Sequence, residues 1–339
     1  MATPTPYQRL FERRKIPGKS PLFFEKYNTL QEHEDVKYLL GSMEPMDADY
    51  TRVTLREAER VYKYLEAFSD IRLQGSVTTN THIRYYSDVD VLSISKEFIT
   101  WEGSLPDTIS VFRGNTIDTL KALRSRCRST IRSEFPAVMI EDKDRALALT
   151  GGSLQRNVDV VIANWYDTLA YVSSKQERDR GIQVLDISVP KRVLNKPFLH
   201  QYHLHQKNNL TGDGQNRAIR LLKTLKMDAS SKIEISSYDI CSLVWNMNST
   251  RLPGGADQSF ILANNVASDL LRWVTNESVL NELVVPNQTR RIIDPNEGTS
   301  LVAVRALWYE LYQLLGRISS SGKKLDRAIY AIGNSVVQR

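Results

Sequence analysis

The sequence predicts an α+β protein with a strand-containing lobe followed by a helical C-terminal lobe. The chain has 339 residues, which exceeds the usual size of a single hydrophobic core, so we expect two packed lobes with a ligand-binding cleft between them. Strand-like segments dominate the middle of the chain, whereas helical periodicity dominates beyond about residue 190. The predicted lobes are therefore residues 1–190 and residues 191–339.

The first predicted lobe combines an N-terminal extension, a long helix and a mixed sheet. Prolines are frequent in residues 1–50, so this extension is predicted to be irregular. Thr54 and Glu57 have the spacing of a capping box and are followed by apolar residues at helical spacing, which predicts a long helix over 54–69 that packs against both lobes. A further helix is expected over 116–134, and strands are expected at 71–74, 87–94, 137–140, 146–150 and 157–162.

The second predicted lobe contains four helices, over 216–226, 237–247, 260–273 and 301–317. The most apolar late segment, 301–315, is interrupted by Arg305 and Glu310 and is too short to span a bilayer. The N-terminus has no apolar region of the kind that a secretory signal needs. Cys127 and Cys241 are far apart and lack Cys-x-x-Cys partners, so the sequence indicates neither a zinc finger nor a disulfide framework. These features predict a cytoplasmic protein.

The charge of the chain is compatible with an anionic ligand but does not identify one. The chain carries 45 basic and 39 acidic residues, a formal net charge of +6. Such an excess favours nucleotides, nucleic acid or an anionic membrane surface, and it is equally compatible with charge that only improves solubility.

Asp88 and Asp90 are the first candidate metal ligands. They alternate with apolar residues in a predicted strand, so their side chains share one face, about 6.5 Å apart at the backbone. Two neighbouring carboxylates repel each other unless a cation lies between them, and Mg²⁺ prefers carboxylate and phosphate oxygens. An isolated Asp-x-Asp pair is more often an exposed strand face, so the interpretation depends on the surrounding residues.

Two further features favour a metal-dependent reaction on phosphates. Gly75 and Ser76 end an upstream strand, where glycine permits close backbone approach and the following N–H groups can face phosphate oxygens. Asp159 lies in a strand of similar pattern, which we predict to lie beside the first. Three carboxylates can hold two Mg²⁺ ions, with Mn²⁺ as a substitute, in an in-line phosphoryl displacement. Asp88 and Asp90 would hold the ion bound to the triphosphate, and Asp159 would help activate the acceptor hydroxyl.

The segment from Gly75-Ser76 to Asp88-Val89-Asp90, with Asp159 on a later strand, resembles the DNA polymerase beta type of nucleotidyltransferase. Within this superfamily the chain is most similar to the bacterial cGAS/DncV-like enzymes (CD-NTases) of CBASS antiphage defence. The resemblance covers most of residues 40–300. It implies a polymerase beta-like catalytic lobe, a helical C-terminal lobe and an active site in the cleft between them.

The resemblance extends to the helical lobe. Lys207, Lys223, Ser237 and Tyr238 are similar to elements that clasp the donor nucleotide in such enzymes, so together with Gly75 and Ser76 they are the predicted nucleotide-binding residues. A lysine can contact phosphate, a serine can donate a hydrogen bond to it, and a tyrosine can stack on a base. Read singly, Lys223 is more often a solvated helix lysine, and Tyr238 is more often a core aromatic.

The resemblance implies that the enzyme joins two nucleoside triphosphates into a cyclic dinucleotide and releases pyrophosphate. The sequence does not identify the bases, and we expect ATP with GTP as substrates and a product such as cGAMP. A separate effector would sense the product. No membrane or nucleic acid partner is expected, and a monomer is expected. Two alternatives stay open: synthesis of linear oligonucleotides or transfer of a nucleotide to RNA or protein, and, from another class, a sensor of nucleotide or RNA without catalysis.

Two other groups of residues could have indicated another function. His200, His203 and His205 lack the further ligands that a zinc site needs, so they are predicted to be polar surface or cleft lining. The basic helix over 116–134 contains no interleaved aromatic residues for stacking on bases, so it is predicted to be a charged outer face. No P-loop, dinucleotide-binding glycine motif or Gly-x-Ser-x-Gly elbow is present in the sequence.

Overall fold

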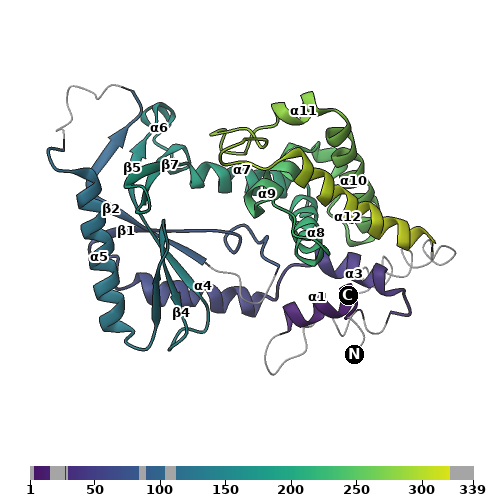
Figure 1. Cartoon of the computed structure of the whole chain (residues 1–339), viewed down its shortest axis with the longest axis horizontal. Helices are drawn as coiled ribbons and strands as arrows, with labels where there is room; N and C mark the ends of the chain where they lie inside the picture. The colour runs from purple at the N-terminus through teal and green to yellow at the C-terminus, as the bar shows by residue number, and fades with distance from the viewer. Residues whose placement is uncertain (1–3, 16–26, 28–29, 84–88, 104–111, 321–339) are drawn as a thin grey trace. The chain divides into compact units, whose positions relative to one another are not determined.

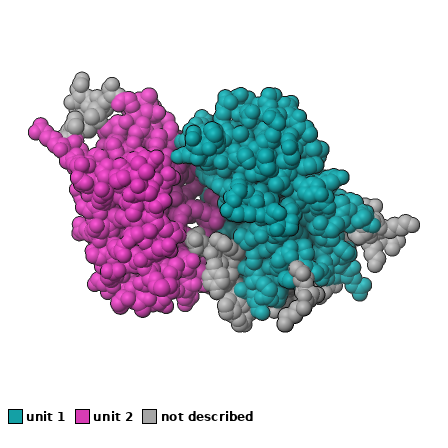
Figure 2. All heavy atoms as spheres, in the orientation of Figure 1, with its two compact units in different colours: residues 1–47, 80–85, 203–339 teal, residues 48–79, 86–202 magenta. Residues whose placement is uncertain are grey.

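The computed structural model describes residues 4–15, 27, 30–83, 89–103 and 112–320 (Figure 1). The chain divides into two compact units (Figure 2). The sheet unit comprises residues 48–79 and 86–202, and the helical unit comprises residues 1–47, 80–85 and 203–339. Both units are therefore assembled from segments that are separated in the sequence.

The sheet unit is built on a mixed sheet of seven strands, in the order β1-β2-β5-β4-β3, with β6 paired to β5 and β7 paired to β6. Strands β2 and β5 run parallel, and the other pairs are antiparallel. The bounds of the strands are β1 Ser69–Gln74, β2 Val89–Trp101, β3 Met139–Asp142, β4 Ala146–Thr150, β5 Val158–Asp167, β6 Gly181–Asp186 and β7 Lys191–Asn195. The predicted strands all occur, whereas β6 and β7 were not predicted.

Each face of this sheet has its own hydrophobic core, because the strand residues alternate between the two faces. Valines of β2 and β5 pack with helices α4 (Ala48–Tyr62) and α5 (Thr116–Glu134) on one face. On the opposite face, Leu92, Ile94 and Trp165 pack with Phe198 from α7 (Pro197–Leu210). Helix α5 has the predicted bounds, and Asn115 caps it by accepting hydrogen bonds from the N–H groups of Ile117 and Asp118. A short helix, α6 (Leu169–Ser174), follows β5.

The helix predicted over 54–69 is shifted towards the N-terminus. Helix α4 begins at Ala48, so Thr54 lies inside it, and its hydroxyl donates to the Tyr50 carbonyl oxygen. Glu57 is buried and accepts from Arg60, so neither residue forms the predicted capping box. The helix ends at Tyr62 because residues 63–68 form turns that lead into β1. The prediction of a helix here is confirmed, but both of its predicted ends were wrong.

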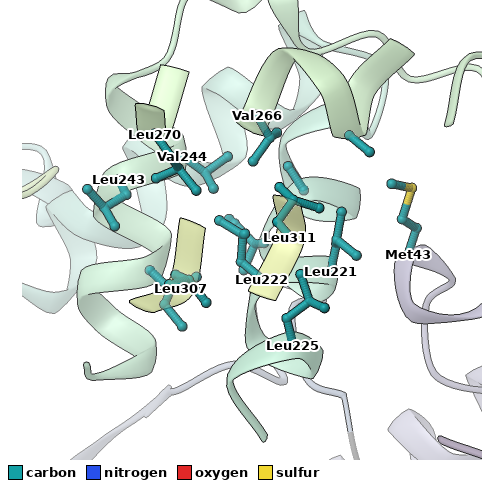
Figure 3. Packing of buried hydrophobic residues seen from close by; sticks show 14 of the residues in the cluster. Met43, Leu221, Leu222, Leu225, Leu243, Val244, Val266, Leu270, Leu307 and Leu311 are labelled. Carbon is teal, nitrogen blue, oxygen red and sulfur yellow. The ribbon is translucent and has the colours of Figure 1, made fainter. Parts of the chain in front are cut away.

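The helical unit surrounds α8 (Gly214–Asp228), whose residues 214–225 are all buried. Leucines of α8 pack with residues of α9, α10 and α12, as the labelled side chains in Figure 3 show. The bounds of the other helices are α9 Ser237–Asn246, α10 Ser259–Thr275, α11 Glu277–Glu282 and α12 Leu301–Ser320. The four helices predicted for this lobe are confirmed within a few residues at each end.

The N-terminal segment belongs to the helical unit, which corrects the predicted boundary at residue 190. Residues 1–50 were predicted to be irregular, but they contain α1 (Pro6–Arg14) and α3 (Glu34–Met43). Leu10, Tyr38 and Met43 are buried in the same hydrophobic cluster as α8 and α12. Residues 191–202, by contrast, contain β7 and belong to the sheet unit. The proline-rich sequence concealed a helix because Pro6 occupies the first turn of α1, where proline is tolerated.

None of the helices in the described part of the chain is both long enough and apolar enough to cross a membrane.

Candidate functional site

The candidate site lies on one row of cross-strand neighbours in the sheet unit. Gln74 of β1 is in register with Asp90 of β2, and Asp90 is in register with Asp159 of β5. The row continues through Ala148 of β4 to Glu141 of β3. Residues opposite each other on neighbouring strands point to the same face of a sheet. The sequence prediction that the strand of Asp159 lies beside that of Asp90 is confirmed.

Asp90 and Asp159 therefore present their carboxylates side by side. Neighbouring strands lie about 4.8 Å apart, which is within the reach of one bound cation for two carboxylates. The residues that flank the two aspartates, Val89, Val91, Val158 and Val160, are fully buried on the other face of the sheet. That burial fixes the register, since a slip by one residue would move the carboxylates into the hydrophobic core.

Gly75 keeps the backbone close to Asp90. Its φ is +103°, a backbone conformation that residues other than glycine rarely adopt. A Cβ atom placed there would lie 3.3 Å from Asp90 Oδ2. The Gln74 side-chain amide also donates to Asp90 Oδ2, at 3.3 Å. Ser76 follows in a tight turn, which is stabilised by a hydrogen bond of 2.8 Å from the Thr78 hydroxyl to the Gly75 carbonyl oxygen. The glycine turn that follows β1 thus lies against the strand that carries Asp90.

Lys143, which was not singled out from the sequence, is an ion-pair partner of Asp159. Its Nζ lies 3.2 Å from Asp159 Oδ2, and the two side chains are 46% and 18% exposed. Lys143 lies in the tight turn between β3 and β4, where its N–H donates to the Ala146 carbonyl oxygen. Only the antiparallel pairing of β4 with β5 brings this turn beside Asp159, so no local sequence signal could have identified it.

We expect Lys143→Met to tighten the binding of Mn²⁺, measured by calorimetry on the nucleotide-free protein. The ammonium group competes with a metal cation for Asp159, and removing such a surface pair changes the binding free energy by roughly 1 kcal/mol, a several-fold change in affinity. Lys96→Met is the matched control, because Lys96 is also 46% exposed and lies 3.9 Å from a different aspartate, Asp70. Equal Mn²⁺ affinities in the two variants would contradict this role of Lys143.

The third predicted ligand, Asp88, lies outside the described residues. Among the side chains that the structure does describe, no group of three acidic, histidine or cysteine residues converges on a metal position. Asp90 and Asp159 nevertheless fit a divalent cation. Carboxylate oxygens are the preferred ligands of Mg²⁺, and the carboxylates of these two residues lie on the same face of adjacent strands. Asp90 and Asp159 are therefore the two predicted ligands whose placement the structure describes.

The two predicted lysine contacts of the helical unit are engaged within that unit. The Lys207 Nζ donates to the carbonyl oxygens of Trp245 and Met247 at the end of α9, and burial lowers the pKa of Lys207 to about 8. The Lys223 Nζ donates to the Thr81 carbonyl oxygen at 2.8 Å, and the residue is 7% exposed. Both side chains hold backbone carbonyls in place, so the geometry offers no direct support for their predicted contacts with phosphate.

Ser237 and Tyr238 lie at the start of α9. Ser236 caps this helix by accepting from the Asp239 N–H, while Ser237 is exposed. The Tyr238 hydroxyl donates to Asn287 Oδ1 at 2.8 Å, and burial is the main cause that raises the pKa of Tyr238 above its ordinary value. The exposed hydroxyl of Ser237 is available to a ligand, whereas Tyr238 is largely fixed by its own unit.

The three histidines of the predicted cluster lie on one helix. His200, His203 and His205 lie on α7, and the ring of His203 lies 5.6 Å from that of Trp245. Among the described residues, no three metal-ligating side chains converge around them.

Comparisons with known proteins agree with this architecture. Residues 203–316 match the cGAS/DncV-like nucleotidyltransferase C-terminal helical domain. The chain is 36% identical over 273 residues to the cyclic dinucleotide synthase CdnE of Yersinia aleksiciae, covering 78% of this chain and 72% of that protein. It is 29% identical over 347 residues to a c-di-GMP synthase of Capnocytophaga granulosa, covering 93% and 98%.

A solved structure extends the likeness to the fold of nearly the whole chain. The STING-associated CdnE c-di-GMP synthase from Flavobacteriaceae sp. superposes with a TM-score of 0.79 at 20% identity, covering 94% of this chain and 98% of that one. The mixed sheet with its helical C-terminal lobe is therefore the fold of these enzymes. Given the matched helical domain and the 36% identity to a CdnE over most of the chain, this protein is a nucleotidyltransferase that belongs to the cGAS/DncV-like family.

Proposed function

We propose that this nucleotidyltransferase is a magnesium-dependent synthase that joins two nucleoside triphosphates into a cyclic dinucleotide and releases pyrophosphate. The observation that carries the proposal is the placement of Asp90 and Asp159 on adjacent parallel strands, beside the Gly75 turn. A relative at 36% identity is named a cyclic dinucleotide synthase, which supports the same reaction class.

The proposed chemistry assigns a part to each group of residues. Asp88, Asp90 and Asp159 would hold two Mg²⁺ ions, which supply charge stabilisation for the attacking and leaving oxygens. The backbone N–H groups of the turn after Gly75 would bind phosphate oxygens of the donor triphosphate. A hydroxyl of the second nucleotide, oriented beside Asp159, attacks the α-phosphorus while pyrophosphate leaves. A second displacement of the same kind closes the ring.

We propose that at least one base of the product is guanine. Two of the relatives reported above are named c-di-GMP synthases, and GTP is one of the two substrates expected from the sequence. The product would act as a second messenger in antiphage signalling and would be recognised by a separate effector. Both c-di-GMP and cGAMP contain guanine, so the experiment has to identify the second base.

The test measures the products that the purified protein makes when one nucleoside triphosphate at a time is left out. The protein is incubated with Mg²⁺ and radiolabelled ATP, GTP, CTP and UTP, each omitted in turn, and products are treated with phosphatase and separated by chromatography. We expect a phosphatase-resistant product that disappears when GTP is omitted. A product from GTP alone identifies c-di-GMP, and a product that needs ATP as well identifies a mixed dinucleotide such as cGAMP.

The same experiment separates the alternatives. Labelled products that lose terminal phosphates and change their chromatographic mobility on phosphatase treatment would indicate linear oligonucleotides. Label in a macromolecular fraction would indicate transfer to RNA or protein. If no triphosphate is consumed under any condition, including Mn²⁺ in place of Mg²⁺, the proposed synthase activity is wrong. Triphosphate binding without consumption would instead support a nucleotide sensor.

A further inference from the structure

Helix α8 carries three buried cations on its path through the helical unit. Arg217, Arg220 and Lys223 are 8%, 0% and 7% exposed. Burying a charged group is costly unless hydrogen bonds compensate for the lost water. The partners of these three side chains therefore indicate which parts of the unit they hold together.

Arg220 and Lys223 hold the same short segment of the chain. Arg220 Nη1 donates to the Asn80 carbonyl oxygen at 2.8 Å, and Lys223 Nζ donates to the next carbonyl oxygen, that of Thr81, at 2.8 Å. The remaining donors of Arg220 bind the Met43 carbonyl oxygen at 2.7 Å and Asp213 Oδ2 at 2.7 Å. Two side chains three residues apart on one helix face thus bind two consecutive carbonyls.

The segment that they hold follows the turn of the candidate site directly. Asn80 has a φ of +54°, and Thr81 and Ile83 are 1% and 4% exposed. The preceding turn, Gly75 to Thr79, directly follows Gln74, the last residue of β1, which is in register with Asp90. The turn therefore follows a residue that the sheet fixes in register, and the two carbonyl groups directly after it in the chain are bound by the two buried cations of α8.

We propose that Arg220 and Lys223 are positioning residues that fix the conformation of the Gly75–Thr79 turn by anchoring the carbonyl groups of Asn80 and Thr81. The part of this inference that concerns nucleotides rests on the proposed function, in which the N–H groups of the turn bind the triphosphate. Arg220 is fully buried and its donors are directed at Met43, Asn80 and Asp213, so it acts through the chain and not by touching a ligand.

Arg217 provides a matched control on the same helix. It is also a buried arginine bonded to backbone carbonyls, but its partners are the carbonyl oxygens of Gly254 and Gly255, the hydroxyl of Ser259 and the Met43 sulfur, and none of them lies in the Asn80–Thr81 segment. Substitution of Arg217 removes a comparable set of hydrogen bonds without releasing the Asn80–Thr81 carbonyls. A general loss of packing in the helical unit would therefore affect all three residues, whereas the proposed anchoring involves only Arg220 and Lys223.

The experiment compares Arg220→Lys, Lys223→Met and Arg217→Lys with the parent chain. Amide hydrogen exchange of peptides covering 74–83 is followed by mass spectrometry without nucleotide or metal, and thermal unfolding is recorded for each protein. We expect exchange in this segment to accelerate about tenfold in the first two variants and to be unchanged in Arg217→Lys. Lys223→Arg keeps a donor at the same position and should restore most of the protection.

A second measurement tests the consequence for nucleotide binding. Calorimetry with an α,β-methylene analogue of GTP in the presence of Mg²⁺ should show about tenfold weaker binding for Lys223→Met and for Arg220→Lys than for Arg217→Lys. A loss confined to Lys223→Met, with unchanged exchange in both variants, would overturn the anchoring role in favour of direct phosphate contact by Lys223.

The failure of this inference can be distinguished from the failure of the proposed function. If the parent chain binds no triphosphate analogue, the proposed function is wrong, and hydrogen exchange still decides whether the two cations anchor the turn. If the parent chain binds the analogue but exchange over 74–83 is equally affected in all three variants, the anchoring by Arg220 and Lys223 is wrong. Should Arg220→Lys fail to fold, Lys223→Met against Arg217→Lys decides the question alone.

Discussion

Replacing Asp90 with asparagine is expected to lower the rate of nucleotide transfer by about 10³-fold or more. Two carboxylates on adjacent strands can share a divalent cation, and an amide in place of one of them weakens both metal binding and charge stabilisation. A loss of about 4 kcal/mol in transition-state stabilisation corresponds to a factor of about 10³ in rate. Initial rates of pyrophosphate release measure this effect, and Mn²⁺ affinity by calorimetry reports on the site independently of turnover.

Glu141→Gln is the matched control for this substitution. Glu141 belongs to the same cross-strand row, two strands beyond Asp159, and is exposed. The substitution Glu141→Gln removes one negative charge from the row but no proposed metal ligand. Activity and Mn²⁺ affinity should therefore stay close to those of the parent chain. If Glu141→Gln and Asp90→Asn weaken Mn²⁺ binding equally, only the general charge of this face matters and the assigned ligand set is wrong.

Gly75→Ala is expected to lower kcat/KM by about 10²-fold. An alanine at this φ of +103° is strained, and its Cβ would lie 3.3 Å from Asp90 Oδ2. Relief of this crowding requires a shift of either the turn or the carboxylate, and strain of this kind amounts to about 1–3 kcal/mol. Steady-state kinetics with varied triphosphate concentration would show the loss, and thermal unfolding would separate it from a loss of folded protein.

Gly151→Ala controls for backbone strain alone. Gly151 also has a positive φ, +70°, but a Cβ placed there meets no atom within 4 Å. This variant should lose stability from the unfavourable φ while keeping its activity per folded molecule. An equal fall of kcat/KM in both variants would show that close approach to Asp90 is not the reason for glycine at position 75.

The arrangement of the aspartates could be predicted because the pattern that carries it is local. Alternation of aspartate with valine around Asp90 and around Asp159 marked two strands of the same kind, and strands of that kind were expected to be neighbours. The valines determine the outcome, since their burial on one face forces the carboxylates onto the other. The face of the sheet on which each carboxylate lies can therefore be predicted from this pattern, whereas the parallel direction of the β2–β5 pairing comes from the structure.

Contacts between distant segments could not be predicted in the same way. Lys143 acquires its partner through the pairing of β4 with β5, and Lys223 reaches Thr81 across 142 residues of sequence. In isolation Lys223 has the sequence character of a solvated helix lysine, yet it is buried because α8 passes through the middle of the helical unit. Helices α1 and α3 were missed for a related reason: most of their stability comes from packing on the helical core.

The division of the chain has a consequence for how this protein can be cut or recombined. Because residues 1–47 complete the helical core and residues 80–85 belong to the same unit, a fragment that begins at residue 203 would expose the surfaces that those segments cover. Transplanting the helical part between relatives therefore requires three stretches of sequence to be exchanged together. A chimera that exchanges only the C-terminal stretch would combine a helical core from one parent with N-terminal helices from another.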